Sequence, residues 1–311
     1  MGRMVVATAY GGPEVLHVIE RRTGRPGPGQ VLVGVKAAGV NAADWKVYTG
    51  AWGTDPSALP IGLGYEAAGV VLGLGPDVEG VAVDDEVIAY PAKGAYADRV
   101  LVKASSLLPK PASMSWEKAG GLMVVGVTAF HAVTATHVGA GDTLLVHGAS
   151  GGVGAMVVQI AHARGARVIG TAAPVNHGYV TDLGAHPVAY GPGLADRVRA
   201  AAPHGVTAAI DTAGTPEALD TSVALVADRR RVATIANFGH GALLHVQLLG
   251  SGPGGDAGTE IRMGARRRLI ELWEAGRIDV RIGATYRLAD VAHAHRAGID
   301  GKVQGKIVLK P

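Results

Sequence analysis

The sequence predicts an α/β protein of two domains, with a doubly wound parallel sheet in its central part and a smaller β-rich domain. From residue 142 onward, short apolar stretches alternate with helix-length segments, which is typical of a parallel sheet covered by helices. Before residue 103, apolar stretches are separated by turn residues rather than by helices. With 311 residues, 48% of them hydrophobic, the chain is long enough to form two cores.

Each element is predicted from its apolar pattern and from the turn residues at its ends. In the β-rich part we expect strands at 69–74, 86–90 and 95–102, then a linker at 109–113. Ser115 is predicted to cap a helix that continues to about residue 137. The central strands are predicted at 143–147, 167–171, 186–190, 207–211 and 230–236, and the helices between them at 152–164, 176–183, 194–201 and 216–226. After a glycine-rich loop at 251–259 we expect a helix to about residue 275, then strands between 280 and 311.

The composition excludes several kinds of protein. The absence of cysteine excludes disulfides, thiolate zinc sites and a cysteine nucleophile. A net charge of +3, with the basic residues dispersed, predicts no nucleic-acid partner. We find no continuous apolar run of about 18 residues and no signal peptide, so we expect a cytoplasmic protein without a membrane partner.

A glycine-rich turn lies between the first central strand and its helix, from Gly148 to Gly154. Gly148 allows the tight turn, Gly151 and Gly152 let a pyrophosphate approach the backbone, and Gly154 allows the helix to pack closely on the strand. Free N–H groups at the start of the helix face the phosphate charges. The strand before the turn, the helix after it and four further alternating units predict a Rossmann dinucleotide-binding domain.

The end of the second central strand decides which dinucleotide is expected. Enzymes that use NAD usually carry Asp or Glu there, whereas residues 168–177 contain no carboxylate that would repel a 2′-phosphate. We therefore expect NADPH rather than NADH, although the same stretch contains no Arg or Lys. Thr171, Asn176, His177 and the more distant Tyr190 are the available hydrogen-bonding side chains.

Several motifs together resemble the zinc-independent quinone oxidoreductases (zeta-crystallin-like) of the medium-chain dehydrogenase/reductase superfamily, over nearly the whole chain. The motifs are Gly39-Val40-Asn41-Ala42-Ala43-Asp44, Gly64-Tyr65-Glu66-Ala67-Ala68-Gly69, Gly126-Val127-Thr128-Ala129, the glycine loop, Asp211-Thr212-Ala213-Gly214 and Gly305-Lys306-Ile307-Val308. The resemblance implies a GroES-like catalytic domain at 1–118 and 280–311, a Rossmann domain at 119–279, and a homodimer.

The resemblance also implies that NADPH binds between the domains, and it implies which residues line the cofactor. These are Asn41, Thr128, Ser150, Gly151, Gly152, Val153, Gly154, Thr171, Tyr190, Phe238, Gly239 and Lys306. Zinc-dependent relatives have a cysteine near the position of Asn41 and a histidine where Tyr65 stands, so the resemblance implies a protein without zinc. Asn176-His177 replaces the Lys or Arg that often follows the second strand, and the region after Phe238 is short.

Hydride transfer without a metal requires a hydrogen-bond donor for the negative charge that develops on the substrate oxygen. The candidate donors are the Asn41 amide, the Lys46 ammonium and the Tyr48 hydroxyl, and Trp52 and Tyr65 are predicted to lie beside a flat substrate. Asn41 could instead cap local backbone, Lys46 and Tyr48 could be solvated surface groups, and Trp52 could be ordinary packing. His147 is expected to pack against the glycine loop rather than act as a base.

Three functions are compatible with these observations. The first is an NADPH-dependent reductase of quinones or activated α,β-unsaturated carbonyl compounds, since conjugation spreads the developing charge. The second is an enoyl-thioester reductase of lipid or polyketide metabolism, which a basic patch for a phosphopantetheine or coenzyme A would favour. The third is a redox sensor that binds NADPH without turnover.

Overall fold

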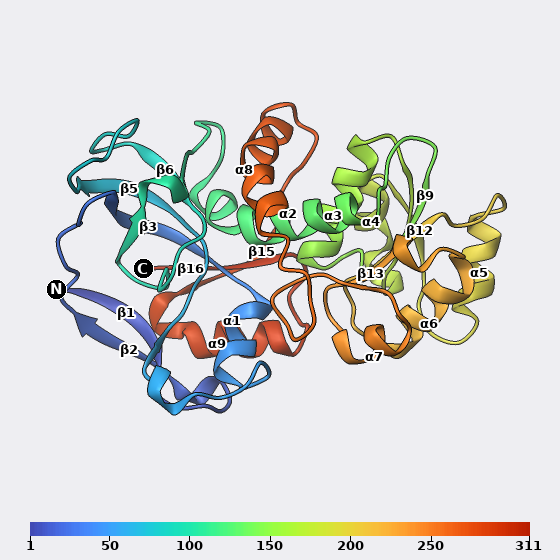
Figure 1. Ribbon diagram of the computed structural model, residues 1–311, viewed down its shortest axis with the longest axis horizontal. Helices are drawn as coiled ribbons and strands as arrows, with labels where there is room; N and C mark the ends of the chain where they lie inside the picture. The colour runs from blue at the N-terminus through green and yellow to red at the C-terminus, as the bar shows by residue number, and fades with distance from the viewer. The chain divides into compact units, whose positions relative to one another are not determined.

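The computed structural model describes residues 1–311, which form two compact units. Unit 1 comprises Met1–Val124 and Val280–Pro311, and unit 2 comprises Val125–Asp279. In Figure 1 the blue N-terminal strands and the red C-terminal strand β16 belong to the same unit. The helix α2 (Trp116–Ala135) carries the chain across the boundary between the units, so the predicted division after residue 118 falls inside this helix.

Unit 1 is built mainly of antiparallel strands. Its strands are β1 (Gly2–Ala7), β2 (Leu16–Arg21), β3 (Gln30–Val40), β4 (Ile61–Gly62), β5 (Ala67–Leu74), β6 (Glu86–Ala89), β7 (Arg99–Lys103), β8 (Leu107–Pro109), β15 (Ile282–Arg287) and β16 (Lys306–Lys310). The long strand β3 pairs with β5, β7 and β16, in a sheet of order β15-β16-β3-β5-β6-β8. Valines 31, 33 and 35 alternate with less buried residues along β3, and they pack in the core of this unit.

Two helices of unit 1 differ from the sequence prediction. The helix α1 (Ala42–Tyr48) follows β3, and α9 (Val291–Ile299) interrupts the C-terminal segment that we expected to form only strands. The prediction of strands alone was wrong at 291–299, because the alternation of alanine and histidine at 292–295 does not show the buried face of the helix. That face includes Val291, Ala294 and His295.

Unit 2 is a six-stranded parallel sheet with helices between its strands. The strands are β9 (Thr143–His147), β10 (Arg167–Thr171), β11 (Ala185–Val188), β12 (Ala208–Asp211), β13 (Val232–Thr234) and β14 (Gln247–Leu248). The helices are α3 (Gly152–Ala163), α4 (His177–Asp182), α5 (Leu194–Ala201), α6 (Pro216–Leu225), α7 (Phe238–Leu243) and α8 (Thr259–Glu274). The strand order β11-β10-β9-β12-β13-β14 reverses between β9 and β12, as in a Rossmann fold. The two-residue strand β14 was not predicted.

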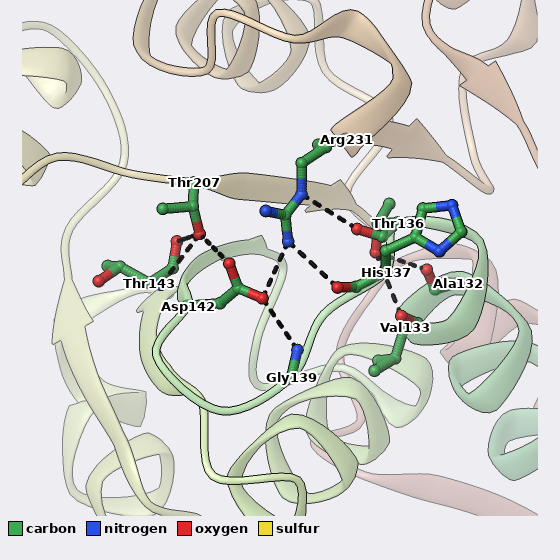
Figure 2. Close-up of polar contacts among 9 residues, drawn as sticks. All are labelled: Ala132, Val133, Thr136, His137, Gly139, Asp142, Thr143, Thr207 and Arg231. Carbon is green, nitrogen blue, oxygen red and sulfur yellow. Dashed lines mark hydrogen bonds and ion pairs between the residues drawn. The ribbon is translucent and has the colours of Figure 1, made fainter.

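The amino ends of three of these strands are joined by a network around Asp142 (Figure 2). The Asp142 carboxylate lies 2.9 Å from the Arg231 guanidinium and accepts hydrogen bonds from Thr207 Oγ1 at 2.8 Å and from Gly139 N–H at 2.9 Å. Arg231 also donates to the backbone carbonyls of Thr136 and His137, where α2 ends. A cation at a helix C-terminus is favourable because the last carbonyls carry partial negative charge.

By length and composition, α2 is apolar enough to cross a membrane, although Glu117, Lys118 and His131 interrupt its apolar residues. Two-thirds of its most apolar stretch is buried inside the structure. Ser115 Oγ accepts a hydrogen bond from Lys118 N–H at 3.3 Å, which confirms Ser115 as the residue that caps this helix. Burial in the protein core accounts for its apolar composition.

Candidate functional site

The glycine loop of unit 2 is shaped by close contacts that leave no room for side chains. A Cβ at Gly154 would overlap the carbonyl oxygen of Gly148, and Gly148 itself has a φ of +73°. No side chain caps α3, and the first backbone N–H of this region with a helical partner is that of Ala155, which donates to Gly151. The N–H groups of Gly152, Val153 and Gly154 therefore remain available for an anion, as a pyrophosphate requires.

Hydrogen bonds from β10 and β12 fix the start of this loop. Gly148 N–H donates to Thr171 Oγ1 at 3.2 Å, and Thr212 Oγ1 donates to the carbonyl of His147 at 2.6 Å. Thr171, which we expected to contact the cofactor, has an exposed fraction of 2%, so in this structure it supports the loop from inside. His147 is buried, and its Nε2 lies 3.1 Å from Ser222 Oγ. Burial lowers the pKa of His147 to about 3, so the ring is neutral and does not act as a base near neutral pH.

Two of the predicted cofactor residues meet directly at the end of β10. Asn176 Nδ2 donates to Ser150 Oγ at 3.2 Å, which links the segment after β10 to the glycine loop. His177 lies beside Asn176, and its Nε2 is 3.2 Å from the carbonyl of Ala172. Tyr190 follows β11 with an exposed fraction of 59%. These polar side chains therefore follow neighbouring parallel strands at the edge where a Rossmann domain binds the adenosine half of a dinucleotide.

Thr128, Phe238 and Gly239, also expected to line the cofactor, lie elsewhere in unit 2. Thr128 is buried in α2, and Phe238 and Gly239 begin α7 directly after β13. The ring of Phe238 packs against the glycine-rich segment 250–255, because a Cβ at Gly252 would lie 2.8 Å from that ring.

In unit 1, Asn41 belongs to a fully bonded polar cluster. Its Nδ2 donates to the Gly39 carbonyl at 3.1 Å and to Glu66 Oε1 at 3.0 Å, and its Oδ1 accepts a hydrogen bond from Lys306 Nζ. Both amide hydrogens are therefore occupied, so in this arrangement Asn41 has no donor left for a substrate oxygen.

Lys306 occupies the centre of the same cluster and has an exposed fraction of 3%. Its ammonium lies 2.9 Å from Glu66 Oε1 and donates to the Val40 carbonyl at 2.9 Å, in addition to Asn41. All three ammonium hydrogens have acceptors, and the second Glu66 oxygen accepts Val124 N–H at 2.8 Å. Glu66 thus compensates a buried cation, a role that the sequence analysis did not assign, although Glu66 lies in one of the quoted motifs.

Tyr48 is fully buried, so the alternative that it is a solvated surface group was wrong. Its hydroxyl lies 2.9 Å from Nδ1 of His295 on α9, which packs against α1. Burial, followed by the charge of Asp44, raises the pKa of Tyr48 well above its usual value, so the hydroxyl keeps its proton. Tyr48 therefore does not reach a substrate in this conformation, and it joins α1 to α9 instead.

Asp44, for which the sequence predicted no role, organises the start of α1. Its buried carboxylate accepts hydrogen bonds from Asn41 N–H at 2.8 Å, Tyr96 Oη at 2.8 Å and Gly64 N–H at 3.1 Å. Burial raises the pKa of Asp44 to about 6, although the bonds from Tyr96 and Asn41 act in the opposite direction.

Lys46 differs from the other two candidate donors because it has no hydrogen-bond or ion-pair partner in the structure. Its side chain is half-buried, and this desolvation lowers its pKa. Trp52 and Tyr65 are also half-buried, and burial raises the pKa of Tyr65. Of the three donors predicted for the substrate, Lys46 alone keeps its hydrogens free.

Comparisons with known proteins agree with this geometry. The family model described as "Alcohol dehydrogenase GroES-like domain" matches residues 27–112, and the model described as "Zinc-binding dehydrogenase" matches residues 152–251. The quinone oxidoreductase of Salmonella typhimurium is 38% identical over 164 residues, which cover 52% of this chain and 50% of that protein. The aligned stretch thus spans about half the length of that relative.

Solved structures match over the whole chain. The quinone oxidoreductase of Escherichia coli, complexed with NADPH, superposes with a TM-score of 0.87 at 27% identity and covers 99% of this chain and 100% of that one. The chain is therefore similar to quinone oxidoreductases in sequence over about half of its length and in structure over nearly all of it. The two family models and this superposition confirm the predicted GroES-like and Rossmann folds. An NAD-dependent alcohol dehydrogenase also superposes with a TM-score of 0.87, at 29% identity and 99% coverage of both chains.

The second family model is described as a zinc-binding dehydrogenase, so the residues at the expected zinc positions need to be compared with a zinc site. In zinc-dependent relatives the cysteine that binds zinc lies near the position of Asn41. The side chain of Asn41 is hydrogen-bonded to Glu66, Lys306 and the Gly39 carbonyl. The histidine position is held by Tyr65, and no group of three or more His, Asp or Glu side chains is placed to hold a metal ion. The residues present therefore do not fit a catalytic zinc site.

Proposed function

We propose that this protein is a zinc-independent, NADPH-dependent reductase of the quinone oxidoreductase type, which transfers hydride to quinones or to activated α,β-unsaturated carbonyl compounds. We further propose that it acts in the cytoplasm as a homodimer. The observation that carries the proposal is the structure of the glycine loop. Three backbone N–H groups at the start of α3 are unpaired, and the Gly148 carbonyl leaves no room for a Cβ at Gly154. NADPH, when bound, supplies the hydride.

The chain's own residues have three tasks in this reaction. The glycine loop binds the pyrophosphate, and Ser150, Asn176 and Tyr190 are proposed to contact the adenosine half. Thr128, Phe238 and Gly239 remain proposed cofactor contacts. Lys46 is proposed to donate a hydrogen bond to the substrate oxygen on which charge develops, since its ammonium has no partner within the protein. Trp52 and Tyr65 are proposed to lie beside the substrate.

The test is NADPH oxidation by the purified protein with 1,4-benzoquinone, 9,10-phenanthrenequinone and a small enone. A crotonyl thioester in the same assay distinguishes an enoyl-thioester reductase. NADPH binding without turnover of any of these substrates would indicate a sensor and overturn the proposal. Lys46→Gln is expected to lower kcat by about 10- to 100-fold with little change in the Kd of NADPH, because one charged donor is lost. Lys46→Arg, which keeps a cation, is the matched control.

A further inference from the structure

A second aspartate of unit 2 lies at the carboxyl end of the sheet, where dinucleotides bind in this fold. Asp211 is the last residue of β12, the strand beside the point at which the strand order reverses, and its side chain is fully buried. No cation is among its partners. One carboxylate oxygen accepts the N–H groups of Ala213 and Gly214, both at 2.9 Å, and the other accepts the hydroxyl of Thr234 at 2.7 Å.

Thr234 extends this hydrogen-bond network to the loop after β13. It is the last residue of β13, and its Oγ1 accepts the N–H groups of Ala236 and Asn237, both at 3.1 Å. Asn237 then donates from Nδ2 to the Gly214 carbonyl at 3.0 Å, and its Oδ1 caps α7 through His240 N–H. The loops after β12 and β13 are therefore shaped by one set of hydrogen bonds that begins at Asp211.

The residue after Asp211 makes a separate hydrogen bond beside the glycine loop. Thr212, next to Asp211, donates to the His147 carbonyl at 2.6 Å, directly before Gly148. In a Rossmann domain the strands on one side of the reversal bind the adenosine half of the dinucleotide, and those on the other side bind its second mononucleotide. Here β10 and β11 lie on the adenosine side, whereas β12 and β13 lie on the nicotinamide side.

We propose that Asp211 is a positioning residue that, through Thr234, sets the two loops holding the nicotinamide half of the cofactor. This inference rests on the proposed function, since it requires that the chain binds NADPH. Asp211 touches neither the cofactor nor the substrate. It holds the two loops through hydrogen bonds from within the protein. Its loss is therefore expected to weaken binding of the nicotinamide half and to leave binding of the adenosine half unchanged.

The substitution Asp211→Asn tests the role because it changes one atom in a definite way. The remaining Asn oxygen can still accept the Ala213 and Gly214 N–H groups. The new amide nitrogen, however, is a donor facing Thr234 Oγ1, whose two acceptor positions are already occupied by Ala236 and Asn237. The hydroxyl hydrogen also loses its acceptor, so the loop at 235–237 must move.

The experiment measures the Kd of NADPH and of 2′,5′-ADP, which carries only the adenosine half, by calorimetry on the full-length protein. We expect Asp211→Asn and Thr234→Val to weaken NADPH binding about 10-fold and to lower kcat further, because a small misplacement at the reacting centre is costly. Binding of 2′,5′-ADP stays within about twofold of the wild type. Thr234→Ser, which keeps the hydroxyl, restores NADPH binding.

Thr207→Val is the matched control, because Thr207 directly precedes β12 and its hydroxyl network lies at the amino end of the sheet. It is expected to lower Tm without changing either Kd. An equal loss of NADPH and 2′,5′-ADP affinity in the Thr234→Val variant would overturn the positioning role, and so would unchanged binding and kcat. If the wild type binds 2′,5′-ADP and NADPH and oxidises NADPH with one of the quinones or the enone, the proposed function stands in both of these cases. If the wild type binds neither, both proposals fail.

Discussion

The two edges of the parallel sheet in unit 2 each carry an aspartate, and the two aspartates have different partners. Asp142, at the amino edge, pairs with the guanidinium of Arg231 at 2.9 Å. Asp211, at the carboxyl edge, is bonded only to backbone N–H groups and to one hydroxyl. The amino edge is therefore a charge-compensated junction between strands and α2, whereas the carboxyl edge keeps a carboxylate whose partners are the loops of the candidate site.

The pKa directions show the same contrast. At Asp142, burial favours the neutral acid, but the hydrogen bonds from Arg231, Gly139 and Thr207 outweigh it and lower the pKa. At Asp211, burial dominates and raises the pKa, although the bonds from Gly214, Thr234 and Ala213 oppose it. The sheet thus tolerates an uncompensated carboxylate only where it shapes loops, which agrees with the observation that perturbed groups gather at functional sites.

The largest effect is expected at the carboxyl edge from Gly154→Val. A Cβ at this position would overlap the Gly148 carbonyl oxygen, so the glycine loop must separate from α3. We expect NADPH affinity to fall by at least about 100-fold, which corresponds to roughly 2.7 kcal/mol of binding free energy. Calorimetric titration measures this loss, and circular dichroism checks that the variant is folded. Retention of wild-type affinity would show that the loop is not the phosphate site.

The opposite edge is expected to affect stability alone. Asp142→Ala removes the ion pair with Arg231 and the acceptor of Thr207 and Gly139, at a site where the Asp142 side chain is 15% exposed. We expect unit 2 to lose about 2 kcal/mol of unfolding free energy, because Arg231 is left half-buried without its counter-charge. Denaturant unfolding gives this value, and calorimetry should give an unchanged Kd for NADPH. Weaker cofactor binding would contradict the separation of the two edges.

As the pH falls, we expect the carboxyl edge to lose stability before the amino edge does, because of His147. The pKa of this buried ring is about 3 in the folded protein, against about 6.5 in the unfolded chain. Its stabilisation is therefore complete above pH 6.5 and is lost as the pH falls toward 3, with a loss of about 2 kcal/mol by pH 5. Asp142, with a lowered folded pKa, begins to lose its contribution only below its unfolded value of about 3.8.

The substitution His147→Gln isolates this effect because glutamine does not titrate. Hydrogen exchange in β9 and β12, compared at pH 7 and pH 5, should show acid-induced opening in the wild type and much less in the variant. His295, whose pKa burial lowers to about 4, has the same sign but lies in unit 1 and is unchanged in both proteins. Equal acid sensitivity of wild type and variant would exclude His147 as the cause.

Much of this architecture was predictable from local sequence. The ranges of β9 and β10 and of α5 were predicted to the residue, because apolar runs and glycine turns mark their ends. The glycine loop was predictable for the same reason. The helix α1 and the strand β14 were not, because seven mixed residues and two residues carry little periodic signal.

The polar partners of the candidate residues could not be predicted, since they come from distant parts of the chain. Lys306 reaches Asn41 across 265 positions, and His295 reaches Tyr48 across 247. These contacts decide which predicted donors remain free, and they leave Lys46 as the donor without a partner. Asp211 stood in a quoted motif, but its bond to Thr234 depends on the pairing of β12 with β13.

The smallest effect is expected from Arg230→Ala, one position before the arginine of the Asp142 network. Arg230 pairs with Asp228 at 2.9 Å, but its side chain is 88% exposed, whereas that of Arg231 is 26% exposed. Solvent screens the exposed pair, so we expect Tm to change by less than about 1 °C and NADPH binding to remain unchanged. A loss of stability as large as that of Asp142→Ala would mean that the basic run at 229–231 stabilises the amino edge through its total charge. Because Arg231, unlike Arg230, donates to the carbonyls of Thr136 and His137 just after α2, the geometry of one guanidinium is expected to be the cause.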